Sequence, residues 1–297
     1  MDFLINMLEE QYGTEITSKI KEGYAKQRAV TFRVNTLKSD IETIENILKK
    51  EKIEYEKVAW SDEAFIIKNA NENKIQELEI YKNGEIYLQS LSSMLPPIIL
   101  NPKEKSDILD MAAAPGGKTT QMAAISNNKA HITACEKNKI RAERLKYNVE
   151  KQGASCVFLM TKDARFIDDF FAFDQILLDA PCSGSGTLNL NDNNSKNVFS
   201  KKLVEKSVLS QEALLKKAIK ILKPGCEMVY STCSILSCEN EDLLEKVLKN
   251  SNAKIVPISF DGMECIPVLP TKINGTLCVL PNEYYEGFFV AKIVKNY

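Results

Sequence analysis

Residues 110–120 read DMAAAPGGKTT, and this stretch decides the fold expected for the chain. The apolar pair Ile108-Leu109 precedes it as the end of a strand, and TTQMAAIS at 119–126 follows it with the composition of a helix. A strand that ends in an acid, turns at Pro115-Gly116-Gly117 and opens a helix brings backbone N–H groups and the helix dipole toward a small anionic or zwitterionic ligand. In an open α/β sheet, ligands bind at this carboxyl end of the first strand.

Spacing separates three loops that share this outline. A phosphate-binding P-loop requires Gly-x-x-x-x-Gly-Lys-Thr, and Gly117-Lys118-Thr119 fit its end, but Ala112 occupies the position of the first glycine. The dinucleotide pattern Gly-x-Gly-x-x-Gly is also absent. The stretch resembles the first motif of an S-adenosylmethionine (SAM) methyltransferase, and an ordinary strand-to-helix turn is the plain alternative. The predicted cofactor contacts in this loop are Asp110, Ala112, Ala113, Ala114, Pro115, Gly116, Gly117 and Lys118.

Length and composition indicate a globular protein of ordinary make-up. The chain has 297 residues, enough for two domains, with 44% hydrophobic and 27% charged residues. No apolar run is long enough to span a bilayer, and the first residues, MDFLINMLEEQYG, carry acids where a secretory leader needs positive charge. We therefore expect a cytoplasmic protein without a membrane partner.

The cysteine and histidine content excludes several chemistries. None of the eight cysteines forms a Cys-x-x-Cys pair, and His131 is the single histidine, so we expect no metal site. Catalysis by a Ser-His or Cys-His pair is excluded for the same reason, and any nucleophile needs another activator. The net charge of −1 gives no global sign of a nucleic-acid partner, so RNA would have to bind through a local patch.

The order of predicted elements divides the chain into two domains. Residues 1–30 have the periodicity of two helices. A strand (31–37), a helix (39–50) and two further strands (55–60 and 64–69) then predict a small α+β domain over residues 1–105, which faces RNA. The polar stretch NPKEKS at 101–106 is the predicted joint.

From residue 106 to residue 297 strands and helices alternate. This pattern predicts the Rossmann-like α/β fold of SAM-dependent methyltransferases, a mostly parallel seven-stranded sheet with helices on both faces. A polar loop covers residues 189–200. The expected strands are 106–112, 131–137, 157–164, 173–181, 227–234, 253–258, 276–282 and 288–294.

Two acids follow the second and third strands of this domain. Glu136 lies 20 residues after Gly116, the offset at which dinucleotide-binding folds place the acid that binds the ribose hydroxyls. SAM carries the same ribose, so Glu136 is the predicted ribose ligand. Asp163 ends the third strand and is expected to meet the adenine. A solvated acid at a strand end is the plain alternative for each, but both stand in register with the glycine loop.

Two cysteines follow the fourth and fifth strands, in Asp179-Ala180-Pro181-Cys182 and Thr232-Cys233. Two thiols at this edge of the sheet suit methylation of carbon 5 of cytosine, which is too electron-poor to attack a methyl sulfonium directly. A thiolate that adds to carbon 6 makes carbon 5 enamine-like, so one difficult step becomes several easier ones. Asp179 is placed to stabilise the ring near nitrogen 3, and Lys118 to favour the thiolate. The residues alone do not decide which cysteine attacks.

The motifs together identify a family resemblance. DMAAAPGGKTTQ, DAPCSGSGT, YSTCS followed by ENE, RVNTLK and YLQSLSSM resemble the Nol/Nop/Sun (RsmB/RsmF-like) family of SAM-dependent RNA cytosine-5 methyltransferases. The resemblance implies that Cys233 is the nucleophile and that Cys182 assists release of the product. It also implies an RRM-like N-terminal module, substrate contacts by Arg33 and Asn35, and contacts to SAM or cytosine by Lys118, Asp163 and Asp179.

The expected function is therefore SAM-dependent formation of 5-methylcytosine in RNA through a covalent cysteine–carbon-6 adduct. Ribosomal RNA is the favoured substrate and tRNA the next, and the protein is expected to be a monomer. Two alternatives stay open at this point. One is a non-catalytic RNA-binding ribosome-assembly factor that retains the fold. The other is an exocyclic-amine methyltransferase, whose activity would survive the loss of both thiols.

Overall fold

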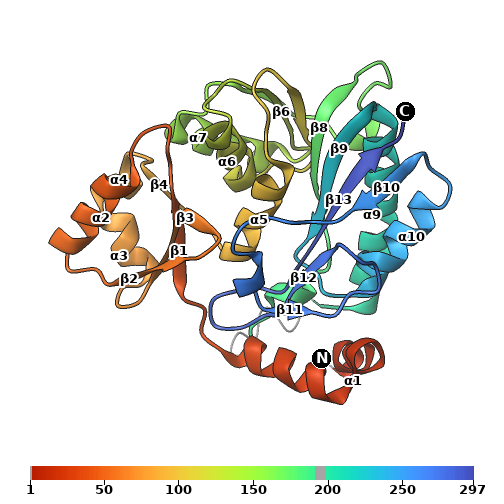
Figure 1. The fold of residues 1–297 in the computed structure, drawn as a ribbon, viewed down its shortest axis with the longest axis horizontal. Coiled ribbons are helices and arrows are strands. Elements are labelled where there is room, and N and C mark those ends of the chain that lie inside the picture. The colour runs from red at the N-terminus through yellow and green to blue at the C-terminus, as the bar shows by residue number, and fades with distance from the viewer. Residues whose placement is uncertain (1, 191–198) are drawn as a thin grey trace.

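The computed structural model of the chain describes residues 2–190 and 199–297, so residues 191–198 of the predicted polar loop lie outside the described part. Two sheets lie side by side, a small one at the N-terminal end and a large one that carries most of the helices (Figure 1). The chain begins with α1 (Asp2–Ala25), which contains a kink at Gly13, where φ is 77°. The kink yields the two helical segments expected from the sequence.

The small sheet belongs to an α+β unit. All of its strand pairs are antiparallel, and one face packs on the helices through an apolar cluster that includes Phe32, Ile44, Leu48 and Phe65. Its strands are β1 (Val30–Val34), β2 (Tyr55–Val58), β3 (Ser61–Ile67) and β4 (Ile86–Leu88), in the order β2-β3-β1-β4, and its helices are α2 (Ile41–Lys50), α3 (Glu72–Glu77) and α4 (Glu79–Lys82). The two short helices α3 and α4 were not predicted, because neither spans enough residues to display helical periodicity.

The large sheet has nine strands among the described residues. They are β5 (Asp107–Asp110), β6 (His131–Cys135), β7 (Val157–Met160), β8 (Phe173–Asp179), β9 (Leu222–Thr232), β10 (Ala253–Val256), β11 (Val268–Leu269), β12 (Leu277–Val279) and β13 (Phe288–Lys295). Its order is β11-β12-β13-β9-β8-β5-β6-β7, and β10 pairs with the second half of β13. The run from β7 to β9 is parallel, and β13 is antiparallel to β9. The fold class is confirmed, with two strands more than the seven expected for the sheet. Eight of the nine strands overlap the predicted segments, and the exception is β11, whose two residues are too few to show strand periodicity.

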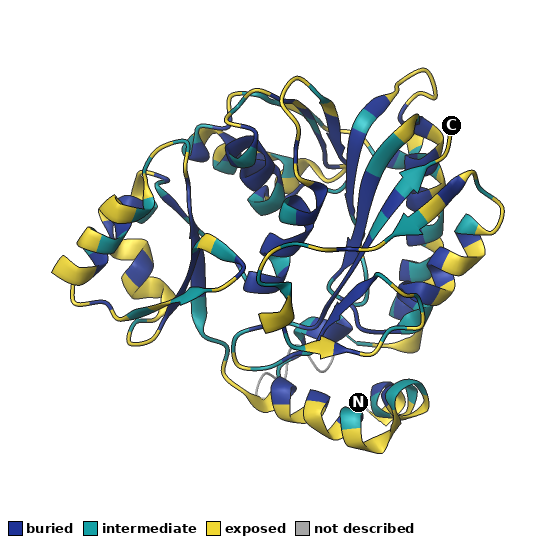
Figure 2. Cartoon of the chain, viewed as in Figure 1, coloured by how far each residue is buried: buried dark blue, intermediate teal, exposed yellow. Residues whose placement is uncertain are grey.

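Helices bury both faces of this sheet. Leu177 of β8 joins an apolar cluster with α5 and α6, whereas its neighbours Ile176 and Leu178 join a second cluster with α9 and α10. Successive side chains of a strand point to opposite faces, so this alternation requires cover on both sides. Figure 2 shows the central strands as a buried layer between helices with exposed outer surfaces. The helices are α5 (Leu91–Leu100), α6 (Gly117–Ile125), α7 (Lys139–Gln152), α9 (Lys201–Ile221) and α10 (Glu241–Leu248), and the short 3₁₀ turns are η1 (Ala164–Phe166), η2 (Ser185–Thr187), η3 (Ser237–Glu239) and η4 (Met263–Cys265).

Helices α1 and α5 both pack on the large sheet although they precede residue 106. Leu4, Leu8 and Tyr24 of α1 join the cluster that contains α9. Helix α5 runs through Pro96 and Pro97 to Leu100 and contacts α6, β8, β9 and β13. The division of the chain between residues 105 and 106 stays a prediction.

Candidate active site

The loop between β5 and α6 turns tightly and packs closely against β4. Gly116 has a φ of 109°, in the left-handed region that favours glycine, and it precedes the first residue of α6. A Cβ atom on Gly117 would lie 3.1 Å from the ring of Tyr87, so this glycine leaves room for the neighbouring β4. Asp110 is buried at the end of β5 and accepts a hydrogen bond from Thr119 (2.7 Å). Burial raises the pKa of Asp110 to about 6.

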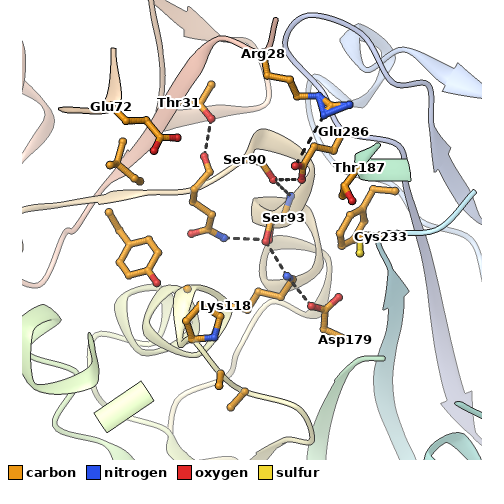
Figure 3. Close-up of a pocket in the computed structure, with 18 of the residues that line it drawn as sticks. Arg28, Thr31, Glu72, Ser90, Ser93, Lys118, Asp179, Thr187, Cys233 and Glu286 are labelled. Carbon is orange, nitrogen blue, oxygen red and sulfur yellow. Dashed lines mark hydrogen bonds and ion pairs between the residues drawn. The ribbon is translucent and has the colours of Figure 1, made fainter. Parts of the chain in front are cut away.

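A cavity of about 590 Å³ opens between the small sheet and the carboxyl edge of the large one. Its size falls in the range of small-molecule sites. Figure 3 shows side chains from both units turned toward this cavity. Thr31 and Glu72 belong to the N-terminal unit, and Lys118, Asp179 and Cys233 lie at the carboxyl edge of the large sheet. The residues of the glycine loop that line it are Asp110, Ala112, Ala113, Ala114, Pro115, Gly117 and Lys118.

Lys118 and Asp179 form an ion pair in the wall of this cavity. Lys118 Nζ lies 2.8 Å from Asp179 Oδ2 and donates a hydrogen bond to Ser93 Oγ (2.7 Å). Ser231 donates to Asp179 Oδ1 (2.8 Å), so both oxygens of this carboxylate have partners. Burial alone would lower the pKa of Lys118, but the carboxylate of Asp179 outweighs it and the pKa is raised. Lys118 is therefore a fixed positive charge beside Cys233.

The two predicted cysteines meet at the ends of β8 and β9. Cys182 Sγ lies 3.2 Å from Cys233 Sγ, and Cys233 lines the cavity. The contact with Cys233, together with burial, raises the pKa of Cys182 well above the usual value of a thiol. Cys182 therefore retains its proton and can donate it toward the sulfur of Cys233.

Glu239 joins the two loops that carry these thiols. Its carboxylate accepts hydrogen bonds from the backbone N–H of Ser183 (2.7 Å), from Ser183 Oγ (2.5 Å) and from Ser234 Oγ (2.5 Å). Ser183 follows Cys182, and Ser234 follows Cys233. A single buried carboxylate thus fixes the chain next to both sulfur atoms.

Glu136 and Asp163 line a second, smaller cavity of about 40 Å³. Ala112 lines both cavities, so the two lie on either side of the glycine loop. Glu136 Oε2 lies 3.3 Å from Arg141 Nη1, and Arg165 holds the pKa of Asp163 below its usual value through hydrogen bonds to both carboxylate oxygens. The structure brings these two acids together with the loop but not with the thiols.

Arg33 of β1 and Asn35, which directly follows β1, are both fully buried and do not line the cavity. Arg33 donates hydrogen bonds to Gln89 (2.9 Å) and Thr120 (2.8 Å), and burial lowers its pKa to about 10. Asn35 donates to the carbonyl oxygens of Gly84 and Gln152. This placement is against direct contact with a substrate, because their donors are used to join the small sheet to α6 and α7.

Several residues of the site were not predicted. Ser93 holds Lys118, and Glu239 holds the two cysteine loops, but neither stands in a motif that by itself indicates chemistry. Gln89 bridges Arg33 to Gln121 and to the carbonyl of Ser93. The only signal in the sequence was their position in two family motifs, because Gln89 and Ser93 lie in YLQSLSSM and Glu239 is the first residue of ENE.

The fold and these residues define a SAM-dependent methyltransferase. The acid at the end of β5, the glycine turn at the start of α6 and the acids after β6 and β7 fit the cofactor, because they surround one loop at the carboxyl edge of the sheet. The sequence model described as 16S rRNA methyltransferase RsmB/F matches residues 97–294, and that of the RsmF/B-like ferredoxin-like domain matches residues 2–73. The chain therefore belongs to the RsmB/F family of methyltransferases, within the predicted Nol/Nop/Sun group.

Named relatives agree with this assignment. A tRNA (cytosine(49)-C(5))-methyltransferase of Pyrococcus abyssi is 36% identical over 89% of this chain and 88% of its own length. A ribosomal RNA small subunit methyltransferase F of Shewanella sp. (strain ANA-3) is 36% identical over 90% of this chain but 56% of its own length. A crystal structure of a methyltransferase homologue from Pyrococcus horikoshii superposes with a TM-score of 0.83 at 31% identity, covering 97% of this chain and 92% of its own. The chain thus spans little more than half of the ribosomal enzyme.

Within 2–190 and 199–297, no helix has the length and apolar character needed to cross a bilayer. No group of three or more histidine, cysteine, aspartate or glutamate side chains in the same ranges is arranged to hold a metal ion.

Proposed function

We propose that this chain methylates carbon 5 of cytosine in RNA, with Cys233 as the nucleophile and Cys182 as the residue that releases the product. The observation that carries the proposal is the pair of sulfur atoms 3.2 Å apart, one of which lines a cavity together with Lys118 and Asp179. SAM supplies the methyl group when it is bound. An enzyme that methylates exocyclic amines has no use for two adjoining thiols.

The chemistry assigns a separate task to each side chain. The thiolate of Cys233 adds to carbon 6, and the electrons displaced into the ring make carbon 5 the atom that takes the methyl group. The carbon-5 proton then leaves to a base, and the bond between carbon 6 and the sulfur breaks. Cys182 keeps its proton because its pKa is raised. It can therefore stabilise the departing thiolate of Cys233 by donating a hydrogen bond to it across the 3.2 Å contact.

Lys118 and Asp179 are assigned to the cytosine ring and to the thiolate. The ammonium group favours the charged form of a neighbouring sulfur. Asp179 is held by Lys118 and Ser231, so its carboxylate is oriented before a base enters. The carboxylate is proposed to bind the edge of the ring near nitrogen 3.

The remaining site residues are assigned to the cofactor. Glu136 is the proposed ligand of the ribose hydroxyls, and Asp163 the proposed neighbour of the adenine. Glu136 is paired with Arg141, and Asp163 with Arg165. Each acid would have to give up part of its contact with the arginine in order to bind the cofactor. The loop residues proposed to contact SAM are Asp110, Ala112, Ala113, Ala114, Pro115, Gly116, Gly117 and Lys118.

The proposed substrate is ribosomal RNA or tRNA. Relatives of both kinds match the chain at 36% identity, over 88% of the length of the archaeal tRNA enzyme and 56% of the length of the ribosomal one. Bisulfite sequencing of total RNA from cells with and without the gene names the target cytosine. A complete absence of gene-dependent 5-methylcytosine would contradict the proposed reaction.

The two cysteines give an asymmetric prediction. Cys233→Ala should lose the covalent protein–RNA adduct and the methylation. Cys182→Ala should accumulate an adduct that resists denaturing electrophoresis, because the sulfur of Cys233 can attach but not leave. Exposed Cys265→Ala is the matched control and should behave as the unaltered protein. If Cys182→Ala abolishes the adduct and Cys233→Ala accumulates it, the two roles are reversed.

We also propose that the protein acts as a cytoplasmic monomer. Its eight cysteines are all free thiols, the state maintained in a reducing compartment. Light scattering coupled to gel filtration should give a mass near 33.4 kDa. A mass twice as large would contradict the proposed monomer.

A further inference from the structure

Arg28 lines the active-site cavity and has no side-chain hydrogen-bond partner within residues 2–190 and 199–297. It lies in the connection between α1 and β1 and is partly buried, with 20% of its side chain exposed. Among the described residues it makes no side-chain hydrogen bond, and its Nε atom is shielded from solvent without a partner. Its single ionic contact in the described part of the chain is Glu286 Oε1, 4.0 Å from Nη1, at the outer limit for an ion pair.

Arg33, a fully buried arginine near Arg28 in the sequence, is a useful contrast. Arg33 lies five residues along the chain and has partners for its donors on Gln89, Thr120 and the carbonyl of Gly117. Its role in holding β1 against α6 accounts for its burial. No equivalent set of partners among the residues that the structure describes accounts for the position of Arg28, although a partly buried guanidinium without hydrogen bonds is costly.

Most of the charged side chains that line the cavity are acidic, which leaves few cations that could bind a phosphate. Its charged lining residues are four acids and two cations, the acids being Glu72, Asp110, Asp179 and Glu286. Of the two cations, Lys118 is already held by Asp179 and Ser93. An entering polyanion therefore meets mainly negative walls, and within the described lining Arg28 is the cation whose donors are not committed.

We propose that Arg28 forms a phosphate-binding subsite of this cavity, which takes a phosphodiester group next to the cytosine that enters. The proposal rests on the proposed RNA substrate and adds a contact that holds the backbone and not the base. The fork of the guanidinium matches two oxygens of a phosphate. Figure 3 shows Arg28 beside Glu286 on the side of the cavity that carries Thr187 and Cys233, so a phosphate bound there stays close to the reacting base.

Glu286 acts in this proposal as the group that occupies Arg28 until RNA arrives. Its Oε2 atom accepts a hydrogen bond from Ser90 (2.8 Å), and its backbone oxygen accepts one from Ser92 (2.7 Å). The carboxylate is thus held in place near Arg28 without a hydrogen bond to it. RNA binding would replace a loose 4.0 Å contact by a close one with phosphate.

The test compares Arg28→Gln with Lys26→Gln, which removes the same charge from an exposed position of the same connection. The probe is a fluorescein-labelled oligocytidine, and its Kd is measured by fluorescence anisotropy over a series of salt concentrations. Arg28→Gln should weaken binding roughly ten-fold and lower the slope of log K against log salt by about 0.7, the contribution of one phosphate on a single strand. The Kd for SAM and the melting temperature should stay those of the unaltered protein, and Lys26→Gln should leave the oligocytidine affinity unchanged.

A second variant covers the case in which Arg28→Gln does not fold. Glu286→Gln removes the competing carboxylate, so it should tighten oligocytidine binding at low salt. Unchanged affinity in Arg28→Gln, or weaker binding in Glu286→Gln, would overturn the proposal. Either result is separable from a failure of the proposed function, because the unaltered protein would still produce 5-methylcytosine in the bisulfite experiment.

Discussion

Asp110 is the residue whose ionisation most directly links the site to the stability of the fold. It is 1% exposed, it has Thr119 as a hydrogen-bond donor, and it shares the region with Asp179 and Lys118. Burial raises its pKa to about 6, from an ordinary value near 3.8. The folded protein therefore favours the protonated acid, whereas the unfolded chain does not.

This shift predicts that the ionisation of Asp110 lowers the stability of the protein without cofactor as the pH rises from about 4 to about 6. Between these values the folded state binds more protons than the unfolded one, so the free energy of unfolding falls with pH. A shift of about two units corresponds to a loss of about 3 kcal/mol. Asp110→Asn should remove this pH dependence, which urea unfolding at a series of pH values would measure. An identical slope in the variant and the unaltered protein would contradict the assignment to Asp110.

At the scale of elements, the site depends on how the loops after β8 and β9 are joined. The backbone N–H of Gly186 donates to the carbonyl of Cys233 (2.9 Å), and that of Gly287 donates to the carbonyl of Gly186 (2.8 Å). A Cβ atom on Gly186 would lie 1.9 Å from the carbonyl oxygen of Gly287, so no side chain fits between these segments. The loops after two parallel strands and the start of β13 are thereby packed backbone to backbone.

Glu239 provides the corresponding side-chain connection, and its removal gives a prediction for this pair of loops. Glu239→Ala leaves the backbone N–H of Ser183 without its partner, which should destabilise the fold by about 1–3 kcal/mol. It should also reduce adduct formation with RNA, because Cys182 and Cys233 are no longer held together. Glu264→Ala, at an exposed glutamate, is the control. Unaltered melting temperature and adduct yield in Glu239→Ala would show that the carboxylate does not join the loops.

At the scale of the whole molecule, the strand ends were predictable but the cavity was not. The cysteines and Lys118 stand in local motifs, and parallel strands bring their carboxyl ends to one edge. Arg28, Ser93 and Glu286 reach the cavity from segments far apart in the sequence, and apart from the position of Ser93 in YLQSLSSM no local pattern marks them. Substrate contacts by Arg33 and Asn35 were expected from the family resemblance, through the motif RVNTLK that contains them. Their burial depends on α6 and α7, which a local pattern cannot include.

The packing of α5 predicts how fragments of the molecule behave. A fragment of residues 106–297 lacks α5, whose side chains Leu91, Met94 and Leu95 are buried in the cluster against the large sheet. We expect that fragment to aggregate or to melt well below a fragment of residues 90–297, because an apolar surface is left uncovered. Circular dichroism on heating compares the two fragments. Equal melting temperatures would mean that α5 is dispensable for the catalytic fold.

The buried hydrogen bonds of Arg33 and Asn35 have a consequence for the order of events in recognition. They tie β1 to the start of α6 and to the end of α7, so the distance between the two walls of the cleft is set by the polypeptide before any RNA is present. A cleft of fixed width cannot widen to accept a base that is still stacked in a duplex. The RNA and not the protein must therefore change conformation for the base to enter. Cytosines in loops or other unpaired positions should accordingly be modified faster than those within stems.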